Sequence, residues 1–137
     1  MANEFNIQVI QDGPRNLVLK ATGVLTASDL AQQVLIDPAL TQGIDNTGNL
    51  KASALSIQRM IYVVEEGLVV NLWWDATTPM RIDDLVKAGH MEYREFSGLS
   101  NNAGVGKTGK ILIGTQGWTV GTTLSFSVVM HLTKKQG

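Results

Sequence analysis

Residues 124–132 read Leu-Ser-Phe-Ser-Val-Val-Met-His-Leu, and this stretch decides the fold class. Its apolar side chains stand at every second position, with Ser125, Ser127, Val129 and His131 between them. Side chains of a β-strand alternate between the two faces of the sheet. The stretch therefore predicts a strand with one buried face and one mostly wetter face.

Two further regions carry the same alternation and a turn signal. Residues 4–10 and 17–21 alternate on either side of Asp12-Gly13. Because Asp and Gly tolerate positive φ angles, this arrangement predicts a hairpin. Residues 57–63 and 68–74 flank Glu65-Glu66-Gly67, and a short loop closed by Gly predicts a second hairpin there.

Additional strands are predicted at residues 80–87, 91–96 and 110–115, with Gly-rich turns between them, including one at Ala88-Gly89. Strands about every 8–12 residues with such turns are typical of sandwiches and jelly rolls. The chain of 137 residues has room for one domain. We therefore expect an all-β fold, a single-domain antiparallel β-sandwich of jelly-roll type over residues 1–137.

Residues 28–35 leave two alternatives open. Ser28 is a suitable helix N-cap, and good helix formers follow it, which favours a short helix. The all-β context favours an extended strand that ends before Pro38. The next segment, residues 42–51, is polar and rich in Asn and Gly, and we expect it to be a surface loop.

Composition excludes several classes of protein. The net charge is −1 and the pI is about 6.1, which argues against nucleic acid as the main partner. The absence of cysteine excludes disulfides, cysteine-based zinc sites and thiol nucleophiles. Apolar runs are far shorter than the ~20 residues that span a bilayer. Residues 1–10 lack the basic and apolar regions of a secretory signal, so we expect a protein made in a cytoplasm with no membrane partner.

The stretch from Asn101 to Thr108 ends in Gly-Lys-Thr, as phosphate-binding loops do. Such a loop begins with Gly and leads into a helix whose N-terminus holds the phosphates. Here Asn101 stands at the first position, and a predicted strand follows Gly109. We therefore predict no nucleotide cofactor and interpret the stretch as a surface loop that contacts a partner through Asn101 and Asn102.

No set of residues predicts catalysis. His90 and His131 have no ligand-spaced neighbours, so no metal site is expected. Glu65-Glu66 falls at a turn, and the adjacent Asp83 and Asp84 of a strand would face opposite sides of the sheet. We predict that the protein is not an enzyme and has no small-molecule substrate.

The tryptophans are candidates for an interface. Trp73 and Trp74 are adjacent, so one of them points inward and the other outward in a strand. Trp118 lies in a loop bounded by glycines. Tryptophan is enriched at interfaces, although each ring can equally pack on its own sheet. The interface candidates are Trp73, Trp74, Trp118, Asn101 and Asn102.

Several of these stretches carry a resemblance when taken together. They are Leu72-Trp73-Trp74-Asp75-Ala76-Thr77, Gly98-Leu99-Ser100-Asn101-Asn102-Ala103-Gly104, Thr108-Gly109-Lys110-Ile111, Thr115-Gln116-Gly117-Trp118 and the closing strand that ends in Lys134-Lys135. Over roughly residues 57–135 the chain resembles small virion proteins of tailed bacteriophages, in particular capsid decoration (cement) proteins.

The resemblance implies a structural role. It implies a homotrimer that sits on the capsid surface of the virion, contacts the major capsid protein and stabilises the assembled head. Binding over a broad packed surface predicts a weak dependence on salt. The alternative is a β-sandwich of a tail or head fibre that recognises host glycans through Trp74, Trp118 or Tyr93.

Overall fold

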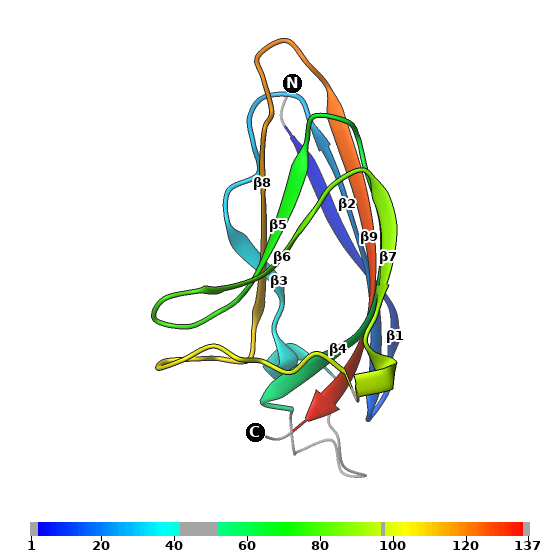
Figure 1. Cartoon of the computed structure of the whole chain (residues 1–137), viewed down its shortest axis with the longest axis vertical. Helices are drawn as coiled ribbons and strands as arrows, with labels where there is room; N and C mark the ends of the chain where they lie inside the picture. Colours follow the sequence, from blue (N-terminus) through cyan, green and yellow to red (C-terminus); the bar gives the residue numbers. More distant parts are fainter. Residues whose placement is uncertain (1–2, 42–51, 97, 136–137) are drawn as a thin grey trace.

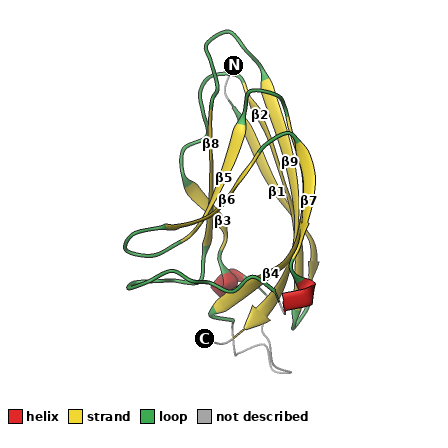
Figure 2. Cartoon of the chain, in the orientation of Figure 1, coloured by secondary structure: helices red, strands yellow, loops and turns green. Residues whose placement is uncertain are grey.

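The computed structural model describes residues 3–41, 52–96 and 98–135 of the chain. These residues form two antiparallel sheets that face each other (Figures 1 and 2). Their strands are β1 (Glu4–Asp12), β2 (Asn16–Leu25), β3 (Gln33–Ile36), β4 (Ala54–Val64), β5 (Val69–Trp74), β6 (Met80–Leu85), β7 (Ala88–Glu92), β8 (Ile111–Gln116) and β9 (Leu124–Lys135). Two 3-10 turns, η1 (Pro38–Leu40) and η2 (Arg94–Phe96), complete the elements.

The strand order identifies the type of sandwich. The five-stranded sheet has the order β1-β2-β9-β4-β7, and the four-stranded sheet has the order β3-β8-β5-β6. The pairs β2–β9, β3–β8, β4–β7 and β5–β6 are therefore nested inside one another along the chain. Wrapping such a nested set into two sheets produces a jelly roll. The predicted all-β sandwich is confirmed.

The core lies between the two sheets. The alternating sequence of β9 explains why one side of this strand faces the core. Phe126, Val128, Met130 and Leu132 point inward and are buried. In the register of the five-stranded sheet, Met130 and Val128 pair with Leu19 and Ala21 of β2, which are buried as well. Residues that face each other across neighbouring strands share one side of the sheet, so both strands present their apolar side to the four-stranded sheet.

The hairpin predicted around Glu65-Glu66-Gly67 is wrong. The turn exists, with Gly67 at a φ of 94° and the Leu68 amide donating to the Glu65 carbonyl at 3.1 Å. However, β4 pairs with β7 and β9, whereas β5 pairs with β6 and β8. The turn therefore carries the chain from one sheet to the other.

The helix alternative for residues 28–35 is also wrong. Residues 29–32 are irregular, and β3 begins at Gln33. The Leu30 amide donates to the Thr115 hydroxyl at 2.7 Å, and the Leu30 carbonyl accepts from the Thr115 amide at 3.1 Å. These bonds to the end of β8 use the backbone groups that a helix would need. The loop expected at residues 42–51 lies outside the described residues.

Other predicted strands occur with shifted bounds. The first hairpin is confirmed, because β1 and β2 are antiparallel neighbours. The strand predicted over residues 91–96 begins earlier, at Ala88, and gives way to η2. Ala88-Gly89 is therefore part of β7, and the reversal occurs at Lys87, whose φ is 58°.

Candidate interaction surfaces

The two adjacent tryptophans divide as the alternation predicts, and the structure shows which one points inward. Trp74 is 1% exposed and belongs to the core, so its place among the interface candidates is wrong. Trp73 lies on the outer side of the four-stranded sheet and is partly exposed. The Arg81 guanidinium lies over its ring, 5.4 Å from the centroid, in a cation–π contact.

Trp118 makes its hydrogen bonds within its own chain. Its indole Nε1 donates to the carbonyls of Leu25 at 3.0 Å and Thr122 at 3.1 Å. Its backbone amide donates to the Asp29 carboxylate at 3.1 Å. The same carboxylate accepts a hydrogen bond from the Thr115 hydroxyl. The ring is partly buried against the core. Trp118 therefore fastens the loop between β8 and β9 to the end of β2.

Tyr93 is also engaged within the molecule. Its ring is partly buried against the core, and its hydroxyl donates to the Met91 sulfur at 3.1 Å. Burial raises the pKa of the phenol, with a further contribution from the Asp83 carboxylate. Trp74, Trp118 and Tyr93 therefore lend no support to a sugar-stacking platform.

The most distinctive surface feature is a projecting pair of loops, residues 75–80 and 101–110, which we call the arm. Both loops extend sideways from the sandwich (Figure 1). The Asp75 amide donates to the Lys110 carbonyl at 3.0 Å, and the Thr108 amide donates to the Asp75 carbonyl at 3.1 Å. These bonds prolong the pairing of β5 with β8 beyond the sheet.

Further contacts brace the arm toward its tip. The Thr108 hydroxyl donates to the Asp75 carboxylate at 2.7 Å. The Thr77 amide donates to the Val105 carbonyl at 3.2 Å. Gly106, at a φ of 82°, approaches Thr77 so closely that an added Cβ would lie 2.1 Å from the threonine hydroxyl oxygen. The two loops are therefore joined along their length.

The arm exposes apolar side chains, Val105 on its longer loop and Met80 where its shorter loop joins β6. Val105 is 88% exposed and Met80 is 41% exposed. A hollow of about 400 Å³ lies between the loops. Its lining consists of Thr77, Thr78, Pro79, Met80, Gly104 and Val105. The arm thus presents valine, methionine and proline to a neighbouring surface.

Asn101 and Asn102 lie on the arm with different roles. The Asn101 side chain accepts a hydrogen bond from the Ala103 amide at 2.9 Å, which shapes the base of the loop, whereas Asn102 is exposed. After Gly109 the chain enters strand β8, as predicted, instead of the helix that a phosphate-binding loop requires.

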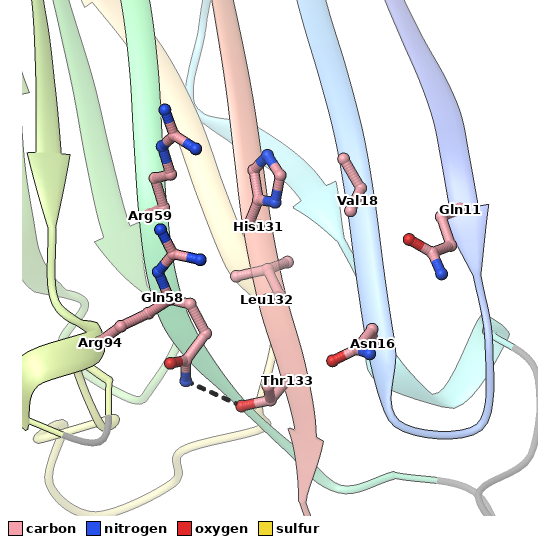
Figure 3. A pocket seen from close by; sticks show the side chains of 9 residues that line it. All are labelled: Gln11, Asn16, Val18, Gln58, Arg59, Arg94, His131, Leu132 and Thr133. Atoms are coloured by element: carbon pink, nitrogen blue, oxygen red, sulfur yellow. Dashed lines mark hydrogen bonds between the residues drawn. The ribbon is translucent and has the colours of Figure 1, made fainter.

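A second hollow, of about 270 Å³, lies on the outer side of the five-stranded sheet. Figure 3 shows Arg59, Arg94 and His131 beside it, with Gln58 donating to the Thr133 hydroxyl at 3.0 Å. The Glu92 carboxylate binds Arg94 through both oxygens and lies 3.8 Å from the Arg59 Nε atom. The hydrogen bond from Arg94 lowers the pKa of Glu92, so one anion offsets part of the basic charge.

The acids and histidines remain dispersed. Asp83 and Asp84 face opposite sides of β6, and Asp84 binds Arg81 and Asn71. His90 lies on β7, 4.0 Å from Glu92, while His131 lies on β9. In the described ranges, no three His, Asp or Glu side chains gather as a metal site requires. None of the described residues forms a helix long and apolar enough to cross a membrane.

Sequence reasoning missed the apolar tip of the arm. Val105 lies in the stretch that was compared with a phosphate-binding loop, and its side chain was not considered. Its position between Gly104 and Gly106 is the signal in the sequence for an exposed apolar tip. Met80 was placed in a strand without regard to its side of the sheet. Comparison with models of protein families finds no match, and comparison with curated proteins finds no relative.

Proposed function

We propose that this chain is a structural protein of a tailed-phage virion that docks on the assembled head and stabilises it. The observation that carries the proposal is the braced arm with its exposed Val105 tip. A protein that clamps adjacent shell subunits must reach past its own body and present apolar surface there. The jelly roll is compatible with this role, since viral capsid domains use it, but a fold alone does not identify a function.

The stabilisation is energetic and needs no catalytic group. A protein that binds the assembled shell and not its separated subunits favours the assembled state by mass action. Many identical contacts on one lattice then add up, because each bound copy tethers several shell subunits. Val105 and Met80 at the arm and a polar surrounding surface are suited to such packing.

The experiment uses phage particles that carry this protein. Chaotrope strips it from the heads, and purified protein is added back as wild type, Val105→Asp or Val120→Asp. Val120 is the matched control, because it is 92% exposed and lies in the loop between β8 and β9, away from the arm (Figure 1). Heat-induced DNA release and bound protein are measured, and circular dichroism checks that each variant folds.

We expect stripped heads to release DNA at a lower temperature. Wild type and Val120→Asp should restore the original temperature, whereas Val105→Asp should bind poorly, because a buried carboxylate at the contact is costly. Stripped heads that are as stable as intact heads would contradict the stabilising role. Equal binding of the two aspartate variants would contradict the role of the arm.

A further inference from the structure

Strand β1 forms one edge of the five-stranded sheet and is poorly covered. Among the described strands, only β2 pairs with it. Ile7 and Val9 lie on the same side of the sheet as Ala21 and Leu19, to which they are paired in register. Ala21 and Leu19 are fully buried, yet Ile7 is 39% exposed and Val9 is 48% exposed. The apolar side of β1 thus projects beyond the cover of the four-stranded sheet.

Over residues 5–9, the edge of β1 also lacks the usual protection against strand pairing. Natural sheets protect edges with charged side chains, prolines, β-bulges or very short strands, and the β-bulge of β1 lies between Val9 and Gln11, outside these residues. Edge strand β6 carries Arg81, Asp83 and Asp84, and edge strand β7 carries Glu92. Edge strand β3 has 4 residues. By contrast, β1 has 9 residues, and its charged residues stand only at its two ends.

We propose that β1 is the contact between two copies of this chain, paired antiparallel about a two-fold axis at Ile7. Each copy contributes the same surface, as an isologous interface requires. The facing pairs are Ile7 with Ile7, Phe5 with Val9, Asn6 with Gln8, and Glu4 with Ile10.

This register follows from the sequence of the strand. A shift by one residue sets apolar positions opposite polar ones, because the period of a strand is two. An axis at Gln8 sets Glu4 opposite Asp12, two like charges that oppose pairing. An axis at Asn6 sets Val9 opposite Asn3, which precedes the strand and whose side chain is bound to residues 26–28. The axis at Ile7 alone pairs the regular segment 5–9 with itself, and this segment ends where the β-bulge between Val9 and Gln11 begins.

The pairing also sets the number of copies. A two-fold contact that uses the free edge of β1 on both partners closes with two copies and leaves no free β1 edge for a third copy. The phage resemblance predicts a trimer instead. The inference does not rest on the proposed function, because it is tested on the purified chain without heads.

The first test is the mass of the full chain in solution by light scattering after size exclusion. Wild type should have the mass of two chains. Ile7→Lys should have the mass of one chain, because it places two ammonium groups opposite each other at the axis. Val120→Lys is the control, an exposed valine exchanged in the same way, and should remain a dimer. A wild-type monomer or trimer, or loss of the dimer in both variants, would overturn the inference.

The second test concerns the register and uses the absence of cysteine in the chain. Ile7→Cys should form a disulfide-linked dimer under oxidising conditions, since opposite residues of paired strands lie within the ~7 Å limit between Cα atoms. Val9→Cys should not, because the two copies of residue 9 lie about four residues, or ~14 Å, apart along the strands. Cross-linking through residue 9 and not residue 7 would overturn the axis.

Discussion

At the scale of single residues, Gly23 shows how tightly the core is fitted. A Cβ atom at this position would lie 2.3 Å from Cε1 of Phe126, which faces it from β9. The ring of Phe126 is buried and also packs against Phe5, with their centroids 6.3 Å apart. The ring therefore has little room to retreat.

We expect Gly23→Ala to lower the free energy of unfolding by about 1–3 kcal/mol, the usual cost of overpacking a filled core. Urea denaturation followed by tryptophan fluorescence measures the change. Gly104→Ala is the control, because nothing lies within 4 Å of a Cβ atom there. If both alanine variants unfold at the same urea concentration as wild type, the contact between Gly23 and Phe126 is looser than described.

At the scale of elements, the arm depends on contacts between its two loops. The Thr108 hydroxyl donates to Asp75 on the other loop and accepts from the Lys110 amide at 3.3 Å within its own loop, while the backbone bond from the Thr108 amide to the Asp75 carbonyl is independent of the side chain. Loss of the bond between the loops in Thr108→Val should therefore cost about 0.5–1.5 kcal/mol locally, the net value of one hydrogen bond.

The expected result is faster amide hydrogen exchange at Asp75, Thr77 and Thr108, whose amides donate between the two loops, with the exchange of β2 and β9 unchanged, because the arm opens without the core. Thr78→Val, on the other loop of the arm, is the control and should leave the exchange of the arm as in wild type. Protection of these three amides that does not change in Thr108→Val would show that the backbone bonds alone hold the arm.

The same scale shows what sequence could and could not predict. Period-two alternation located the strands, because burial on one face imposes that period on a strand. The Glu65-Glu66-Gly67 turn was located as well, but a turn records only that the backbone reverses. Whether β5 then pairs with β4 or crosses to the other sheet depends on contacts with distant β8 and β9. Likewise, adjacent Trp73 and Trp74 had to face opposite ways, but only the packed core selects Trp74 as the inner one.

At the scale of the whole molecule, the proposed docking leads to a prediction about salt. The chain has a net charge of −1, and the arm presents an exposed valine, Val105. The Debye length falls from about 10 Å at 0.1 M to about 3 Å at 1 M salt, which removes attraction between exposed charges but not apolar packing.

We therefore expect the affinity of the purified protein for stripped heads to change little between about 0.1 and 1 M sodium chloride. Quantitative pull-down with the heads measures it, and a head-binding protein held by surface ion pairs serves as the comparison. A steep loss of binding with salt would indicate that the basic side chains beside the outer hollow, Arg59 and Arg94, dominate the contact.

The nested strand pairs have a consequence for how each copy is made. β2 lies beside β9, and β4 also needs β9 as a neighbour, so the centre of the larger sheet waits for the last described strand to leave the ribosome. Pairing between such distant segments makes folding slow. A chain whose synthesis stops before residue 124 lacks the strand that joins β2 to β4 and exposes two unpaired edges. A truncated copy therefore cannot close its larger sheet, and its exposed edges favour pairing with other chains.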